Sequence, residues 1–148
     1  PNIVYTCIGY GEEEENLKKL VKELNLENQV LFLKNISQEL KNALLAKSNL
    51  FVMPSIIYKK SVEGFGIAYI EAAQYGLPSI GGKDGGESDA IKNSETGIIC
   101  DGNSLDEIYS SIDLILKNNS YKNFVNRSKE FAKKFEWDSI ILKYLKIL

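Results

Sequence analysis

Two glutamates, Glu63 and Glu71, stand eight positions apart and bracket the stretch of this chain best suited to chemistry. Two glycines, Gly64 and Gly66, follow the first glutamate, and a mostly apolar run over residues 67–73 leads past the second. The pattern is typical of a loop that opens into a helix, whose first turn has unpaired N–H groups and a partial positive charge that attract an anion. Glycines let the backbone approach such a ligand, and the carboxylates can accept hydrogen bonds from hydroxyls. A ligand with both phosphates and hydroxyls is a nucleotide or a nucleotide sugar.

The same residues also allow a plainer interpretation. Most glutamates lie at the protein surface, so Glu71 can be a surface residue of a helix and Glu63 a loop residue. However, Glu71 lies between Ile70 and Ala72 in a helix with few other polar positions, where a carboxylate usually has a partner. The pattern by itself leaves the two interpretations equally open.

Short apolar runs alternate with segments of helical periodicity along the whole chain. Strands are expected at residues 3–8, 30–33, 50–53, 77–80 and 96–100; helices are expected at 12–24, 38–47, 66–75, 104–117, 121–134 and 137–145, with a helical turn at 89–91. This alternation predicts an α/β fold with a Rossmann-like parallel sheet and helices on both faces. Ligands of such sheets bind at the carboxyl ends of the strands. Every glycine-rich loop here follows a strand, so all of these loops are expected at that one edge.

Two local patterns give more specific expectations about the helices. Leu17, Leu20, Val21 and Leu24 recur at helical spacing and are expected to form the buried face of the first helix. Ser104 precedes Glu107 by three residues, a spacing that predicts a capping box at the start of the helix that follows.

Composition excludes several classes of function. The 148 residues fit one domain, and a net charge of −2 without a basic stripe argues against a nucleic-acid partner. Histidine is absent, which excludes a Ser-His-Asp triad, a Cys-His pair and a histidine-ligated zinc ion within this chain. Apolar runs are far shorter than the roughly 20 residues that span a bilayer. Cys7 and Cys100 are expected to be free residues of the core or of strand ends.

Two glycine motifs compete with the nucleotide-sugar interpretation. Gly9 and Gly11 follow the first expected strand, but the dinucleotide fingerprint needs a third glycine where Glu14 stands. Gly82 and Lys83 resemble part of a P-loop, yet the required spacing is missing. A tight turn explains the first motif at least as well as a ligand does.

One further set of motifs follows a known order: Pro54-Ser55, Glu63-Gly-Phe-Gly-Ile67, Glu71-Ala72, Gly76-Leu-Pro78, Gly85-Gly86, Thr96-Gly97 and Phe135-Glu-Trp137. In this order and spacing, residues 3–148 resemble the C-terminal, nucleotide-sugar-binding domain of the group 1 retaining glycosyltransferases. The resemblance implies the C-terminal half of a GT-B fold. It identifies the pair Glu63 and Glu71 as the family's Glu-x7-Glu motif.

The resemblance also implies a role for each candidate residue. Glu63 is the catalytic candidate, which contacts hydroxyls of the transferred sugar and stabilises charge near the anomeric carbon. Glu71 binds the ribose hydroxyls, and the loop at Asn35 and Ile36 binds the base through its backbone. The remaining nucleotide-sugar-binding candidates are Ser55, Gly64, Phe65, Gly66 and Ile67, of which the last three place their backbone against the diphosphate.

This chain departs from the family pattern in two places. Glu87-Ser88-Asp89 follows Gly85-Gly86 where the family usually has x-Pro-Glu, which weakens the case for a ligand contact from that loop, and Lys34 stands where a glycine is common. In similar proteins a strand–helix unit with a basic pair, and before it an acceptor-binding domain, precede the residues matched here. Lys59, Lys60 and Lys83 are candidates to replace those cations, although each is better explained as a solvated loop charge.

The resulting expectation is that residues 1–148 are the donor-binding domain of a larger protein, truncated at its N-terminus and inactive alone. The start Pro-Asn-Ile-Val-Tyr, without methionine or basic leader, agrees with a fragment. With the missing N-terminal acceptor domain, the enzyme would transfer a hexose from a UDP-, GDP- or ADP-sugar, with retention and without a metal ion, to a saccharide or lipid-linked acceptor. Bacterial surface polysaccharide synthesis, in the cytoplasm or peripherally on the inner membrane, is the expected setting.

Two other functions remain open. A nucleotide-sugar 2-epimerase also uses a two-lobed GT-B arrangement, but Glu-x7-Glu with Gly-Phe-Gly fits the transferases better. A module that only binds nucleotides, or only assembles with a partner, has the same residues available, because half of an active site would lie outside this chain. Nucleotide titration separates the last possibility from the others.

Overall fold

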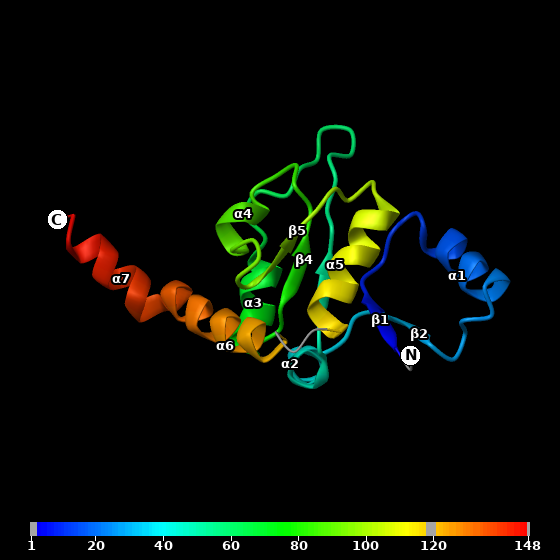
Figure 1. Cartoon of the computed structure of the whole chain (residues 1–148), viewed down its shortest axis with the longest axis horizontal. Coiled ribbons are helices and arrows are strands. Elements are labelled where there is room, and N and C mark those ends of the chain that lie inside the picture. The colour runs from blue at the N-terminus through cyan, green and yellow to red at the C-terminus, as the bar shows by residue number, and fades with distance from the viewer. Residues whose placement is uncertain (1–2, 118–120, 148) are drawn as a thin grey trace. The chain divides into compact units, whose positions relative to one another are not determined.

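The computed structural model describes residues 3–117 and 121–147, and the chain divides into two compact units. The N-terminal unit comprises residues 1–43, and the C-terminal unit comprises residues 44–148. Helix α2 (Gln38–Lys47) runs across the boundary between them. Figure 1 shows the order of the elements along the chain.

The N-terminal unit contains two parallel strands and the helix that connects them. These are β1 (Tyr5–Ile8), α1 (Glu14–Glu23) and β2 (Val30–Leu33). Strand β1 pairs with β2 in register from Tyr5 opposite Val30 to Ile8 opposite Leu33. Acidic residues stand in the first turn of α1 and Lys22 in the last, which matches the charges to the helix dipole.

The prediction that α1 has a buried face is wrong. No residue described between positions 3 and 43 is fully buried; Leu17, Leu20 and Leu24 are exposed, and Val21 is only half-buried. A sheet of two strands is too narrow to cover the apolar stripe of a helix, so the periodicity predicts the helix correctly but not its burial.

The C-terminal unit contains a three-stranded parallel sheet in the order β3-β4-β5. Its strands are β3 (Phe51–Met53), β4 (Ser79–Gly81) and β5 (Gly97–Ile99); its helices are α3 (Ile67–Gln74), α4 (Glu87–Ala90), α5 (Leu105–Lys117), α6 (Tyr121–Ala132), the short 3-10 turn η1 (Lys133–Phe135) and α7 (Trp137–Leu145). The expected helical turn at 89–91 is α4, and the helix expected at 121–134 is α6 followed by η1. Figure 1 shows α7 running from α6 away from the sheet, with Trp137 78% exposed.

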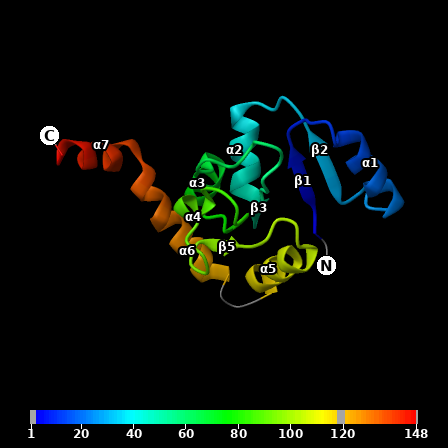
Figure 2. The ribbon, with the colours of Figure 1, turned by 90° about the horizontal axis from the view of Figure 1, so that it is seen from above.

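Two hydrophobic cores cover the two faces of this sheet. Successive residues of a strand point to opposite faces, and Figure 2 shows α3 and α5 on opposite sides of β5. Tyr69 and Ile70 of α3 pack with Phe51, Met53 and, from α6, Phe131. The opposite core comprises Ile80, Cys100, Ile115 and Phe124, with Val52 and Leu50 against it. Cys100 is thus the buried strand-end residue that was expected, while Cys7 is half-buried, and both are free thiols.

The single sheet expected from the alternation is present as two parallel sheets. Strands β2 and β3 are consecutive in the chain but pair in different sheets, β1-β2 and β3-β4-β5. Parallel pairing and helical cover agree with the predicted fold class, whereas the grouping of strands into sheets depends on contacts between residues far apart in the chain. No helix in the described residues 3–117 and 121–147 is long and apolar enough to cross a membrane.

Candidate functional site

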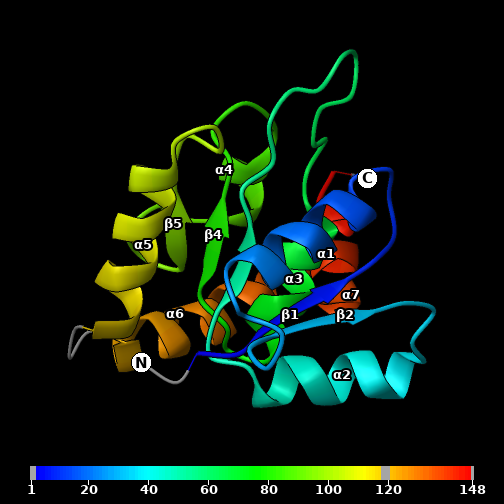
Figure 3. The ribbon, with the colours of Figure 1, turned by 90° about the vertical axis from the view of Figure 1, so that its right-hand side faces the viewer.

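Three loops gather at the carboxyl ends of the strands of the C-terminal unit. The parallel register of β3, β4 and β5 directs residues 54–66, 82–86 and 100–104 to the same edge of the sheet, as Figure 3 shows for the first two. This confirms, for the C-terminal unit, the expected position of the glycine-rich loops. Most of the predicted site residues, Ser55 and Glu63 to Ile67, lie in or directly after the first of these loops.

Glycines allow these loops to pack backbone on backbone. A Cβ on Gly82 would lie 1.8 Å from the carbonyl oxygen of Ser55, and one on Gly86 would lie 2.0 Å from that of Gly64. Real Cβ atoms do not approach backbone oxygens so closely, so a side chain at either position would force the loops apart. The Gly85-Gly86 pair therefore allows its loop to pack closely against the loop that carries Glu63. The sequence did not predict this structural role.

The two glycines beside Glu63 differ in their surroundings. Gly66 has φ +86° directly before α3, and a Cβ there would lie 2.3 Å from the ring of Tyr69. Gly64 has no atom within 4 Å of the position its Cβ would take. Gly66 thus sets the entry into the helix, while Gly64 leaves open space beside the catalytic candidate.

Glu63 is held by its own loop and by the loop after β4. Its carbonyl oxygen accepts a hydrogen bond from the Gly86 N–H at 2.8 Å. Its side chain is half-buried, and Oε1 accepts a hydrogen bond from the Phe65 N–H at 3.4 Å. The ring of Phe65 in turn packs against Phe135, with 5.6 Å between the ring centroids. The backbone around Glu63 is therefore well anchored, whereas the hydrogen bond to its carboxylate is long and comes from its own loop.

Tyr69 ties the start of α3 to the end of β3. Its side chain is fully buried, and its hydroxyl donates a hydrogen bond to the carbonyl oxygen of Met53. Burial, the largest cause, and the nearby carboxylates of Glu87 and Glu63 together raise the pKa of Tyr69 to about 12, against a hydrogen bond with Ser55 that lowers it. The hydroxyl remains a donor at neutral pH. Sequence reasoning did not single out Tyr69, because a buried tyrosine and an exposed one have the same local pattern.

The remaining candidates are distributed over both units. Ile67 begins α3 and is exposed, and Glu71 is half-buried in the middle of that helix. Ser55 follows β3, where its hydroxyl lies 3.4 Å from the carbonyl oxygen of Met53. Asn35 and Ile36 follow β2 in the N-terminal unit; Asn35 is exposed, with φ +47°.

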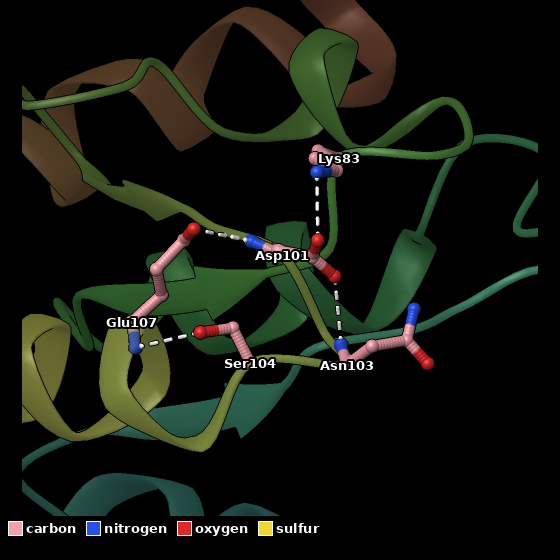
Figure 4. Close-up of polar contacts among 5 residues, drawn as sticks. All are labelled: Lys83, Asp101, Asn103, Ser104 and Glu107. Carbon is pink, nitrogen blue, oxygen red and sulfur yellow. Dashed lines mark hydrogen bonds and ion pairs between the residues drawn. The ribbon is translucent and has the colours of Figure 1, made fainter.

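Lys83, a candidate counter-charge, already has an anionic partner. Its Nζ lies 2.8 Å from Oδ2 of Asp101, which follows β5 (Figure 4). The pair raises the pKa of Lys83 and lowers that of Asp101. Lys59 and Lys60 lie at the exposed tip of the first loop, where Lys59 stands 4.9 Å from the centroid of the Tyr58 ring. In the described parts of the chain neither of these two lysines forms an ion pair with a carboxylate.

The predicted capping box at α5 is half correct. Ser104 Oγ accepts a hydrogen bond from the Glu107 N–H at 3.2 Å, as expected of an N-cap. The Glu107 carboxylate, however, accepts from the Asp101 N–H at 2.8 Å instead of reaching back to Ser104 (Figure 4). Asp101 also accepts from the Asn103 N–H at 2.8 Å, so its carboxylate organises the loop after β5.

Glu87 is a buried carboxylate that sequence reasoning passed over. It begins α4, is 1% exposed, and its Oε2 accepts a hydrogen bond from the Gly85 N–H at 2.9 Å. Its neighbours Ser88 and Asp89 are exposed. The only signal in the sequence was the departure from the family pattern at this place. Among the described residues, no group of three or more His, Cys, Asp or Glu side chains is arranged to hold a metal ion.

The chain is similar to known proteins over most of its length. It matches the family of group 1 glycosyl transferases over residues 1–135. The GDP-mannose-dependent alpha-(1-6)-phosphatidylinositol monomannoside mannosyltransferase of Mycolicibacterium smegmatis is 30% identical over 118 residues, 78% of this chain and 31% of that protein. The N-acetyl-alpha-D-glucosaminyl L-malate synthase of Bacillus anthracis is 31% identical over 139 residues, 93% of this chain and 35% of that protein.

Solved structures show the same fold. Anabaena HepE in complex with UDP has a TM-score of 0.78 at 21% identity, covering 100% of this chain and 42% of that one. The chain thus has the predicted fold of the C-terminal half of a GT-B protein and spans about a third of the length of the two curated relatives. The match over residues 1–135 shows that this chain belongs to the group 1 glycosyl transferases.

Proposed function

We propose that this chain binds the nucleotide-sugar donor of a glycosyltransferase that moves a hexose to an acceptor with retention of configuration. The observation that carries the proposal is the loop from Glu63 to Gly66. Its backbone is anchored by Gly86, it enters α3 through a left-handed glycine, and it leaves open space at Gly64. Similar proteins named for GDP-mannose or solved with UDP support a nucleotide sugar as the ligand class.

The proposed roles are those that the resemblance to the family implies for these residues. The diphosphate lies at the N-terminus of α3, where free N–H groups and the helix dipole favour negative charge. Glu63 contacts sugar hydroxyls beside Gly64, and Glu71, about one turn along α3, binds the ribose hydroxyls. Asn35 and Ile36 contribute the base-binding loop. Catalysis then consists of orienting the sugar and stabilising charge on the departing diphosphate, with helix and cations in place of a metal ion.

The cations themselves are proposed to come from outside this chain. Asp101 neutralises Lys83, and Lys59 and Lys60 stand at an exposed loop tip. A preceding strand–helix unit with a basic pair, together with an acceptor domain, would complete the site in the full-length protein. The acceptor is proposed to be a saccharide or a lipid-linked saccharide of the bacterial surface, at the cytoplasmic face of the inner membrane.

Calorimetric titration with UDP, GDP and ADP, on this chain and on the full-length protein, tests the donor site. We expect weak binding of one nucleotide that falls by about 10- to 100-fold in Glu71→Ala, the equivalent of a hydrogen bond to a charged group. Gln74→Ala is the matched control, because Gln74 is an exposed polar residue of the same helix. Failure of both proteins to bind any of the three nucleotides at millimolar concentration would refute the proposal and favour an assembly module.

A further inference from the structure

Glu87 is the one carboxylate that is fully buried among the residues the structure describes. Removing a carboxylate from water is unfavourable unless its oxygens receive hydrogen bonds, so a glutamate in this position needs a local reason. Its nearest surroundings belong to the site edge. A Cβ on Gly81, the last residue of β4, would lie 3.4 Å from Cβ of Glu87. Glu87 thus fills the space under the loop that follows β4.

Two successive amides of that loop donate hydrogen bonds to different acceptors. The Gly85 N–H donates to Oε2 of Glu87 at 2.9 Å, and the Gly86 N–H donates to the carbonyl oxygen of Glu63 at 2.8 Å. Neither glycine can carry a side chain. A Cβ on Gly85 would lie 2.5 Å from the Glu63 carbonyl oxygen, and one on Gly86 would lie 2.0 Å from that of Gly64. The peptide between these amides therefore has little freedom to move independently of Glu87.

We propose that Glu87 is a positioning residue of the donor site, whose carboxylate orients the Gly85-Gly86 peptides and, through them, the backbone of Glu63. The inference rests on the proposed function, because Glu87 matters for donor binding only if Glu63 contacts the sugar. Packing alone would be satisfied by an apolar residue of the same size. What a glutamate adds is an acceptor aimed at the Gly85 N–H, which fixes the direction of that peptide.

Two substitutions separate the acceptor from the volume it occupies. Glu87→Met keeps the length of the side chain and removes the acceptor, while Glu87→Gln keeps an acceptor oxygen and removes the charge. Asp89→Ala is the control, since Asp89 is exposed on the same short helix. Amide hydrogen exchange of the intact chain, followed by NMR at Gly85 and Gly86, gives a readout that does not depend on a ligand.

We expect exchange at both amides to accelerate by about five- to tenfold in Glu87→Met, the equivalent of one typical hydrogen bond. Glu87→Gln and Asp89→Ala should stay within about twofold of the wild type, because neither removes the acceptor. Unchanged exchange at Gly86 in a folded Glu87→Met variant would overturn the inference. If Glu87→Met does not fold, strongly accelerated exchange in a folded Glu87→Gln would overturn it as well, since that variant retains an acceptor.

A binding measurement on the full-length protein links the loop to the sugar. UDP, UDP-glucose, GDP and GDP-mannose are titrated into the wild type and Glu87→Met. A displaced Glu63 should weaken binding of the sugar nucleotide more than binding of the free nucleotide. The affinity for the sugar nucleotide divided by that for the free nucleotide should then fall by at least about threefold. Equal weakening of both would indicate a general structural defect and overturn the positioning role. If the wild type binds none of the four probes, the proposed function is overturned. The exchange experiment then still decides whether Glu87 orients the loop.

Discussion

The two units of this chain show how similar sequence patterns lead to different degrees of burial. Both contain parallel strands of three or four residues connected by helices. The C-terminal unit encloses fully buried residues on both faces of its sheet, whereas no described residue of the N-terminal unit is fully buried. A third strand and helices on both faces make the difference, because apolar side chains become buried only when other elements cover them.

The glycines in the loops of the two units also differ in how closely other atoms surround them. Gly82 and Gly86 in the C-terminal unit lie against backbone carbonyls, while Gly11 in the N-terminal unit has nothing within 4 Å of a possible Cβ. Each of these glycines follows a strand and looks alike in the sequence. The comparison indicates that the loops that hold most of the candidate site pack more tightly at their glycines than the loop at Gly11 does.

The largest expected effect concerns core residues at matched strand positions. Ile80 of β4 is 0% exposed and Leu31 of β2 is 48% exposed. Ile80→Ala should lower the free energy of unfolding by about 2–5 kcal/mol through lost burial and the cavity that remains, whereas Leu31→Ala should cost less than about 1 kcal/mol. Urea denaturation followed by circular dichroism measures both. Equal losses for the two variants would show that the N-terminal unit buries Leu31 in solution.

The glycine comparison predicts an intermediate effect. Gly82→Ala places a methyl group against the Ser55 carbonyl oxygen, so the backbone must shift, at a cost of about 1–3 kcal/mol of unfolding free energy. Gly11→Ala meets no atom and should be neutral or stabilising by up to about 1 kcal/mol. Thermal unfolding of the two variants beside the wild type checks the difference. A Gly82→Ala protein as stable as the wild type would contradict the tight packing of the loops.

The smallest expected effect concerns the ion pairs of one carboxylate in each unit, Asp101 in the C-terminal unit and Glu14 in the N-terminal unit. Lys83 lowers the pKa of Asp101, and Lys18 and Lys34 lower the pKa of Glu14. A carboxylate whose pKa is lower in the folded than in the unfolded protein stabilises the fold above its unfolded pKa. The stabilisation is lost as the pH falls through the folded pKa.

Unfolding midpoints in urea, measured from pH 7 to pH 3, should therefore fall slightly less in Asp101→Asn and Glu14→Gln than in the wild type. High salt should reduce both differences, because exposed pairs are screened. The two variants should behave alike, since in both units a partly exposed carboxylate pairs with exposed lysine side chains. A much larger effect for Asp101→Asn would show that its network with Asn103 and Glu107 organises the loop more strongly than an exposed pair does.

Part of this protein could be predicted from residues that are neighbours in the sequence. The alternation of strands and helices, the parallel pairing, the carboxyl-edge position of the glycine loops and the Glu63–Glu71 motif all depend on local spacing. Local spacing controls hydrogen bonding within helices and the direction of side chains along strands. The same information identified the family that the match over residues 1–135 shows.

Only the tertiary structure decided which of these residues are buried, paired or sterically constrained. The stripe of α1 is exposed, Lys83 is paired with Asp101, Glu87 is buried, and Gly86, unlike Gly64, excludes a side chain. Each of these facts depends on which other segments of the chain pack against the residue, and helix or strand periodicity does not predict that. A periodic pattern specifies which way a side chain points from its own backbone, but its environment is set by the elements that fold against it.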